Sequence, residues 1–488
     1  MNPRRLFVAS CVALIASAFS FVTRGDILPA LGQTFNLSQT SRGSILGAAF
    51  WGMAAAMFVG SFIVDALGMK RMLGVAFLAH LVGAVMTIGS PYFVGHGNSD
   101  AAYSVLWYAT FLVGCANGFV EIGINPLAAT LYPTEKTHRL NILHAWWPGG
   151  LMLGGLICYA IDRAMGLNAE GVTAATVQFG WQIKAGLMLV PTVIYGILFF
   201  SEPFPVTERV ASGVTTGAMF AQIFRPMFLL WAFCMLLTAS TELGPQSWQN
   251  SVLPLTAGVN GTLIVVYTSS LMFVMRHFAG PIAHRLSPVG MLTGSAILSA
   301  IGLYLLSFAT SPITAIGAAT VYGLGIIYFW PTMLGVTAER FPKGGPFLMG
   351  LMGCVGNLAI AATSPMIGGI FDVQTLKNLP ADVKDRVVVE RTQEPLEKLI
   401  TGFLPADARA AIVAPSKVDL AKVADLPTRE AKQEVTQALA EGAKSSFRAV
   451  SVLPMILIVI FGAIAISDRL RGGYKPEELP AAVAATDY

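Results

Sequence analysis

The sequence predicts an all-α membrane protein with twelve transmembrane helices in two six-helix bundles, and three observations lead to this prediction. Of its 488 residues, 55% are hydrophobic and only 12% are charged, whereas soluble domains carry roughly 25% charged residues. The mean hydropathy is +0.65. Twelve apolar segments are long enough to cross a hydrocarbon core, which takes about 20 helical residues. Helices are expected because a spanning segment must satisfy its own backbone hydrogen bonds.

The twelve segments follow one another with short connections, except before the last. The first could be mistaken for a cleaved signal peptide. We expect it to be retained as a spanning helix, because its apolar stretch is too long and no small-residue cleavage site is clear. The segments lie near 6–34, 43–66, 71–89, 102–131, 141–162, 181–201, 226–250, 258–283, 289–309, 312–338, 346–371 and 447–468.

Basic residues predict the orientation of the chain. With the N-terminus in the cytoplasm, the inner ends of the segments carry fourteen lysines and arginines, and the short outer loops with their flanks carry three. Positive residues collect on the cytoplasmic side of membrane proteins. We therefore expect a multi-pass protein of the inner cell membrane, surrounded by lipid, with both termini in the cytoplasm. The net charge of +4 follows from this topology, and no nucleic-acid partner is expected.

Glycine and proline recur at a constant spacing between the fourth and tenth segments. Gly118 and Pro126 have counterparts in Gly323 and Pro331, each 205 residues later. Repeats of this kind enclose a binding site near the membrane midplane and rock about it. We therefore divide the chain into a first bundle (1–201), a cytoplasmic linker (202–225) and a second bundle (226–488).

Residues 372–446, between the last two segments, differ from the rest because they contain 11 lysines and arginines and 12 acidic residues. Long loops cross the membrane regardless of charge, so we expect an extracytoplasmic insertion. Its residues 395–400 and 429–439 have the pattern of short amphipathic helices. The insertion is either a solvated cap without chemistry or a surface that gathers substrate or binds a partner.

Glu121 lies near the middle of the apolar stretch 106–131. A charge at the bilayer centre costs about 2.5–3.5 kcal/mol on insertion scales, so such a residue usually has a function. Asn117 and Asn125 lie four residues before and after it, on the same helix face. We expect this polar stripe to face the bundle interior and Glu121 to take up and release a proton. The alternative is a permanently protonated side chain bonded to a neighbouring helix.

The turn between the second and third segments is similar to a known family motif. Asp65-Ala-Leu-Gly-Met-Lys-Arg resembles the cytoplasmic signature of the major facilitator superfamily, whose members have two six-helix bundles. The resemblance implies that Asp65, Lys70 and Arg71 help to hold the inward gate.

Three further stretches look like the fucose–proton symporter family of sugar carriers. They are Gly25-Asp26-Ile-Leu-Pro, Glu121-Ile-Gly-Ile-Asn125-Pro126 and Arg139-Leu-Asn-Ile-Leu-His-Ala-Trp-Trp. The resemblance implies that Asp26 and Glu121 handle substrate and proton. His144 and Trp147 stand where that family commonly has glutamine and asparagine.

Other polar and aromatic residues within the segments are candidates for a substrate site. Sugars suit a pocket of aromatic surfaces with a few amide and carboxyl groups, although tryptophans also serve as interfacial anchors and an amide can simply bridge two helices. Glu242 can alternatively bond to Arg24 or to a hydroxyl, and Arg276 is expected to snorkel or to belong to a gate. The substrate-binding candidates are Arg24, Asn117, Asn125, His144, Trp147, Glu242, Gln246, Trp330 and Asn357.

The sequence favours a secondary transporter over an enzyme. It contains no phosphate-binding loop, clustered metal ligands or nucleophile–base set, so no cofactor is expected. We predict a monomeric carrier that couples uptake of a monosaccharide to protons, with Na⁺ as the alternative coupling ion. An exporter, a carrier of nucleosides or other metabolites, and a non-transporting receptor that uses residues 372–446 remain alternatives. Because Ile326 is the repeat counterpart of Glu121, we expect the second bundle to supply mainly shape.

Overall fold

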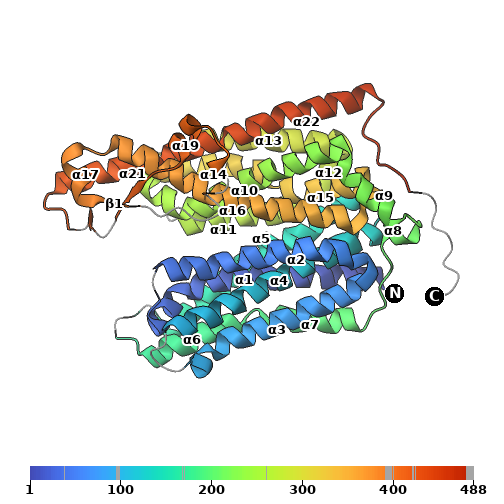
Figure 1. The fold of residues 1–488 in the computed structure, drawn as a ribbon, viewed down its shortest axis with the longest axis horizontal. Coiled ribbons are helices and arrows are strands. Elements are labelled where there is room, and N and C mark those ends of the chain that lie inside the picture. Colours follow the sequence, from blue (N-terminus) through green and yellow to red (C-terminus); the bar gives the residue numbers. More distant parts are fainter. Residues whose placement is uncertain are drawn as a thin grey trace.

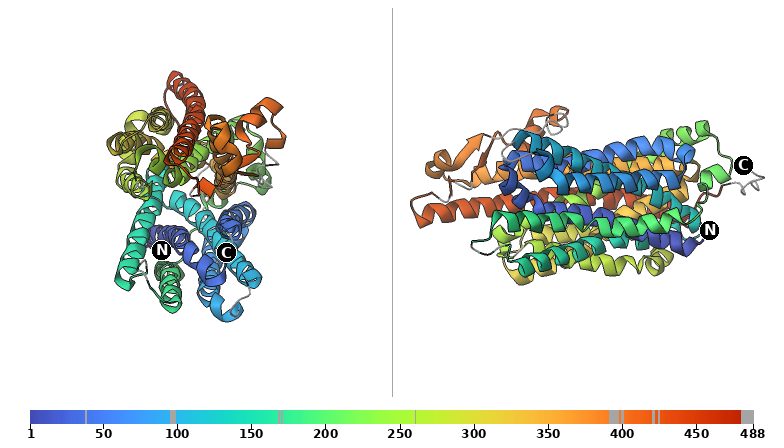
Figure 2. Two further views of the ribbon diagram at one scale, coloured as in Figure 1. Left: turned by 90° about the vertical axis from the view of Figure 1, so that its left-hand side faces the viewer. Right: turned by 90° about the horizontal axis from the view of Figure 1, so that it is seen from below.

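The computed structural model describes residues 1–37, 39–94, 99–167, 169, 171–259, 261–390, 398, 401–419, 422–423 and 425–479. Its helices form two groups that lie alongside each other, one from each half of the chain (Figures 1 and 2). The first group consists of α1 (Pro3–Phe35), α2 (Gln39–Leu67), α3 (Met69–Val94), α4 (Ser99–Leu131), α5 (Lys136–Met165), α6 (Ala174–Gly186) and α7 (Leu189–Phe200).

The second group begins after a linker that contains the short helices α8 (Glu208–Ala211) and α9 (Thr216–Ala221) and the 3₁₀ turn η1 (Gln222–Phe224). It consists of α10 (Pro226–Ala257), α11 (Gly261–Arg276), α12 (Ala279–Leu286), α13 (Pro288–Leu306), α14 (Pro312–Ile326), α15 (Phe329–Arg340), η2 (Pro342–Gly344), α16 (Gly345–Asn378), α21 (Arg429–Val450) and α22 (Val452–Leu470). Helix α1 begins and α22 ends at the same end of the molecule, which we call the terminal end (Figure 1).

In the described part of the chain, each of the twelve predicted segments is mainly helical. Among the described residues, ten spans are long and apolar enough to cross a membrane, and α11 with α12 forms an eleventh that bends by 66°. The remaining predicted segment, the fifth (141–162), lies in α5, whose 30 residues are less apolar because they include Asn141 and His144. Helix α5 packs against α1, α11 and α15, so neighbouring helices cover much of its surface. The predicted fold class is confirmed.

Three predicted spans are broken helices. The sixth breaks between α6 and α7, the eighth between α11 and α12, and the tenth between α14 and α15. The last break lies at Ile327–Tyr328, four residues before Pro331. Proline has no N–H to donate to the carbonyl one turn back, so the break leaves the carbonyl of Ile327 without its helical donor.

The insertion begins and ends on the neighbouring helices. Helix α16 continues to Asn378, and α21 runs into α22 so that one helical stretch covers Arg429–Leu470. The amphipathic helix predicted over 429–439 is therefore the start of a longer helix, and 395–400 falls outside the described residues except for Lys398. At the end opposite the termini, α17 (Ala381–Val387), α19 (Ala406–Ile412) and the antiparallel strands β1 (Val388–Glu390) and β2 (Ser416–Val418) complete a cap (Figure 1).

The two helix groups make close contacts toward the terminal end through glycines. A Cβ atom on Gly335 of α15 would lie 2.5 Å from the Thr137 Oγ1 atom of α5, and one on Gly350 of α16 would lie 2.7 Å from the Cβ atom of Ser61 in α2. Small residues allow helix backbones to approach in this way. The absence of a side chain at these two positions thus permits the contact between the two halves.

We predict that Gly335→Leu destabilises the protein, because the new side chain would overlap Thr137. Overpacking of this kind costs about 1–3 kcal/mol, and thermal unfolding of the purified protein measures it as a lower melting temperature. Gly317→Leu is the matched control, since a Cβ atom there meets nothing within 4 Å. Equal melting temperatures for the two variants would contradict the packing account.

Candidate functional site

Glu121, Asn125 and His144 form a hydrogen-bonded chain between α4 and α5. The Asn125 Nδ2 group donates to Glu121 Oε2 at 2.6 Å, and His144 Nε2 lies 2.9 Å from Asn125 Oδ1. An amide oxygen only accepts, so His144 donates from Nε2. Each of the three side chains is at most 4% exposed. Of the stripe Asn117–Glu121–Asn125, the structure thus brings Glu121 and Asn125 into direct contact, and His144 continues their chain.

Arg276 connects the hydrogen-bonded side chains of Glu121, Asn125 and His144 to the second helix group. Its Nη1 atom donates to the carbonyl oxygen of His144 at 2.7 Å, and its Nη2 atom lies 3.2 Å from Glu242 Oε1. Its Nε atom donates to the carbonyl oxygen of Ile327 at 2.6 Å. Arg276 is only 2% exposed, so the expectation that it snorkels is wrong. Its guanidinium joins α5 of the first half to α10 and the α14–α15 break of the second.

Prolines explain why these carbonyl groups are available. Pro148 and Pro331 each lie four residues after a carbonyl that Arg276 binds, those of His144 and Ile327. Since proline lacks the N–H that would complete the helical bond, the arginine supplies the missing donor. Pro245 likewise frees the carbonyl of Thr241 on α10, and the Tyr322 hydroxyl lies 3.0 Å from that carbonyl oxygen and 2.7 Å from that of Glu242.

Several buried polar atoms near this junction have no hydrogen-bond partner among the described residues. They are Glu242 Oε2, the Ser269 hydroxyl and both polar atoms of the Gln249 side chain. Gln249 lies seven residues after Glu242 on α10, and Ser269 lies seven residues before Arg276 on α11, so each is two turns away on the same face. Buried polar groups are nearly always paired. We therefore take these atoms as candidates for contact with the polar groups of a ligand.

Asp26 and Arg24 lie apart from Glu121. Lys184 Nζ is 2.5 Å from Asp26 Oδ2 and 2.5 Å from Asp162 Oδ1, so Asp26 belongs to a three-membered charge cluster that joins α1, α5 and α6. Its side chain is 30% exposed. The Arg24 guanidinium donates to the Thr110 hydroxyl of α4. The structure does not bring the two predicted acids, Asp26 and Glu121, into one contact network.

Asn117 takes part in a second buried network. Its Nδ2 group donates to the Ser20 hydroxyl at 3.0 Å, and its Oδ1 atom lies 2.8 Å from His80 Nε2. The other ring nitrogen of His80 lies 3.0 Å from the Tyr195 hydroxyl. Sequence reasoning missed His80 and Tyr195, although a histidine inside the apolar third segment was a usable signal.

The remaining substrate candidates have different surroundings. Asn357 Nδ2 donates to the carbonyl of Gly353 at 2.9 Å and lies 3.3 Å from the Met57 sulfur of the first half. Trp330 is buried, and Trp147 is partly buried with its ring 5.1 Å from that of Phe21. Gln246 is partly buried on α10.

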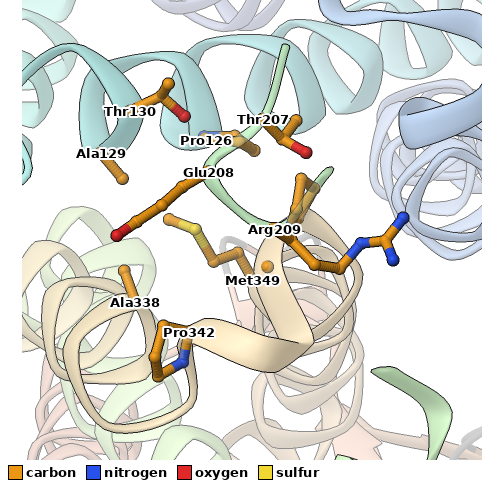
Figure 3. A pocket seen from close by; sticks show the side chains of 11 residues that line it. Pro126, Ala129, Thr130, Thr207, Glu208, Arg209, Ala338, Pro342 and Met349 are labelled. Carbon is orange, nitrogen blue, oxygen red and sulfur yellow. The ribbon is translucent and has the colours of Figure 1, made fainter. Parts of the chain in front are cut away.

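The predicted gate residues have different surroundings: Asp65 contacts the linker, Lys70 contacts the end of α7 and the start of the linker, and Arg71 is exposed. Asp65 accepts from Arg209 Nε at 2.6 Å and from the Thr207 hydroxyl at 2.7 Å. Lys70 donates to the carbonyls of Phe200 and Glu202, and Arg71 is exposed. Figure 3 shows residues 207–209 of the linker beside α4 on one side and residues 338–349 on the other, around a small pocket.

Glu339 closes the terminal end between the halves. Its Oε1 atom accepts from both the backbone N–H (3.1 Å) and the hydroxyl (2.7 Å) of Thr137, and its Oε2 atom accepts from the Tyr474 hydroxyl at 2.6 Å. Burial, together with the adjacent Glu339 carboxylate, raises the pKa of Tyr474 well above its usual value. The hydroxyl therefore stays protonated as a donor near neutral pH, and the C-terminal segment supports the contact.

Known proteins resemble this chain in sequence and fold. The family model described as Major Facilitator Superfamily matches residues 6–364. A facilitated glucose transporter, solute carrier family 2 member 10 of Xenopus laevis, is 23% identical over 175 residues, which are 36% of this chain and 27% of that relative. The match thus spans about a quarter of that relative's length.

Two solved transporters share the fold. The Major Facilitator Superfamily transporter FucP in its outward conformation has a TM-score of 0.63 and 12% identity, covering 92% of this chain and 98% of its own; another structure identifies FucP as the Escherichia coli fucose:proton symporter. The proton:xylose symporter XylE, bound to 6-bromo-6-deoxy-D-glucose, has a TM-score of 0.64 and 14% identity, covering 74% of this chain and 87% of its own.

We predict that Glu339→Gln loosens the terminal end, because the carboxylate loses its charge-assisted bonds to Thr137. Such bonds contribute about 1.5–3 kcal/mol each, so labelling of Ala129→Cys by a water-soluble maleimide should accelerate about tenfold or more. Glu135→Gln is the control, since Glu135 pairs with Arg139 on its own helix end. Unchanged labelling in Glu339→Gln would contradict a closing role for this residue.

Proposed function

The chain belongs to the Major Facilitator Superfamily, and we propose that it is a secondary active transporter that takes up a monosaccharide, or a similar small polar metabolite, together with protons. FucP and XylE, which share its fold, are described as sugar:proton symporters. The observation that carries the proposal is the buried chain from Glu121 through Asn125 and His144 to Arg276, because it joins a carboxyl group to the contact between the two halves.

Protonation of Glu121 changes the hydrogen bonds that link it through Asn125 to His144. Asn125 donates to the ionised carboxylate, and a protonated carboxyl group gains a donor of its own. When Oε2 carries the proton, it becomes a donor toward Asn125, so the amide has to turn its oxygen to Glu121 and its bond to the His144 ring changes. The backbone carbonyl of the same residue, His144, accepts from Arg276, so we expect a movement of the His144 ring to reach the inter-half contact.

We infer that a sugar would pair with the polar atoms of the second half. Its hydroxyl groups can donate to Glu242 Oε2 and exchange hydrogen bonds with the Gln249 amide and the Ser269 hydroxyl, which lack partners among the described residues. Trp147 and Trp330 supply apolar surface for the C–H faces of a sugar ring. Binding would thus satisfy polar groups that are otherwise buried without partners.

The proposal places the terminal end in the cytoplasm, in accord with the basic residues of the inner loops. The contacts of Gly335, Gly350 and Glu339 hold the two halves together there. The structure then corresponds to the state closed toward the cytoplasm. Alternating access requires these contacts to separate.

We predict that the purified protein in liposomes accumulates a sugar of the fitting size when the outside is acidified. A monosaccharide panel, tested with and without an imposed pH gradient, measures this, and a sodium gradient at constant pH is the control. Accumulation that is identical with and without the pH gradient would refute proton coupling. A response to sodium alone would assign the coupling to that ion.

We also predict that Glu121→Gln abolishes uphill accumulation and retains sugar exchange across the membrane at equal pH. Glutamine preserves the shape and accepts a hydrogen bond but does not titrate, so the binding site stays while the coupling is lost. Glu441→Gln is the control, because Glu441 pairs only with Lys444 on the exposed part of α21 among the described contacts. Normal accumulation by Glu121→Gln would show that Glu121 does not carry the proton.

A further inference from the structure

The chain turns back after α22 and runs across the terminal end of the molecule. Gly472 and Gly473 have φ angles of 87° and 101°, in the left-handed region that glycine adopts without strain. The N–H of Gly473 donates to the carbonyl of Asp468 at 2.9 Å and closes the turn. We call residues 471–477 the strap. The turn directs the strap from the end of α22 toward α9 (Figure 1).

Two residues attach the strap to α15 and to the linker. The Tyr474 hydroxyl donates to Glu339 Oε2 at 2.6 Å, and the backbone N–H of Glu477 donates to the carbonyl of Glu339 at 2.8 Å. The Glu477 carboxylate lies 2.8 Å from Arg225 Nη1, at the end of the linker. The Arg340 guanidinium lies 4.9 Å from the centroid of the Tyr474 ring. The strap thus holds the end of α15 through both its backbone and its side chains.

The Glu339 carboxylate connects the strap to the first half. In the described part of the chain, the hydrogen bonds and ion pairs of the strap go to the second half and to Arg225, and none goes directly to the first half. Glu339 Oε1 accepts from the Thr137 hydroxyl of α5, while Oε2 accepts from Tyr474. The strap therefore does not tie the halves together. It determines the orientation of the side chain that does.

We propose that the strap is a positioning device for closure at the terminal end. Tyr474 holds Glu339 in the orientation that Thr137 binds, and so favours the closed state. A free glutamate side chain loses rotamer freedom when it is fixed in one position, and fixing it in advance lowers the entropic cost of a contact. The proposal concerns this contact alone and does not depend on the identity of the transported substrate or of the coupling ion.

The test measures opening as the rate at which a water-soluble maleimide labels Ala129→Cys in the full-length protein in detergent. Ala129 is buried at the terminal end (Figure 3), and the protein with only its five native cysteines gives the background. Tyr474→Phe removes only the hydroxyl. We expect it to accelerate labelling roughly three- to tenfold, the effect of losing one hydrogen bond. Tyr108→Phe, on the exposed surface of α4, is the control.

A double-mutant cycle separates positioning from general support of the fold. In a Glu339→Ala background, Tyr474→Phe should cause no further acceleration, because the tyrosine then has no carboxylate to orient. Gly473→Val displaces the strap by a second route, since valine is strained at a φ of 101° although its Cβ atom meets nothing within 4 Å. Its acceleration should likewise disappear in the Glu339→Ala background.

Two results would overturn the proposal. One is labelling at the wild-type rate in both Tyr474→Phe and Gly473→Val. The other is an acceleration by Tyr474→Phe that is as large in the Glu339→Ala background as in the wild type, since the strap would then act without orienting the carboxylate. If one of the two variants does not fold, which its thermal unfolding shows, the other variant decides.

Discussion

The junction of the two halves depends on one buried guanidinium, that of Arg276. A polar group in an apolar helical bundle needs a partner, because no water is at hand to replace it. Prolines in α5 and α15 remove the helical donors of two carbonyls, and Arg276 binds both while it pairs with Glu242. Loss of this side chain would leave two carbonyls and a carboxylate without their donors. Arg276 therefore stabilises the interface between the halves and connects it to the hydrogen-bonded side chains that lead to Glu121.

Each half of the protein contains buried charged side chains. Glu121 has an apolar repeat counterpart, Ile326, which suggested that the second half supplies mainly shape. The second half instead contains the buried pair of Glu242 and Arg276, and the carboxyl of one half is linked to that pair through Asn125 and His144. At the terminal end, the linker and the C-terminal segment add contacts through Asp65, Arg209, Glu339 and Tyr474. Closure at that end thus combines contacts between the bundles with contacts from the linker and the C-terminal segment.

The helices could be predicted from the sequence because length and apolarity alone identify a membrane span. The Glu121–Asn125 contact was predictable too, since residues four apart share a helix face. The partners of Asn117, Asp26 and Glu242 were not. Asn117 turns to His80 on α3, Asp26 pairs with a lysine 158 residues away, and Glu242 reaches Arg276 because α11 ends and bends there. These contacts depend on how distant helices pack and on where helices break. The periodic pattern of apolar and polar residues in the sequence predicts neither.

The central claim is that the protonation state of Glu121 controls the contact between the two halves. Distances between spin labels on the terminal ends of α4 and α15, measured by electron paramagnetic resonance at several pH values in lipid, test it most directly. The account predicts that acidification shifts the wild-type distance distribution, and that Glu121→Gln stays at the acidic distribution at every pH. A Glu121→Gln variant whose distances follow pH as the wild type does would contradict it.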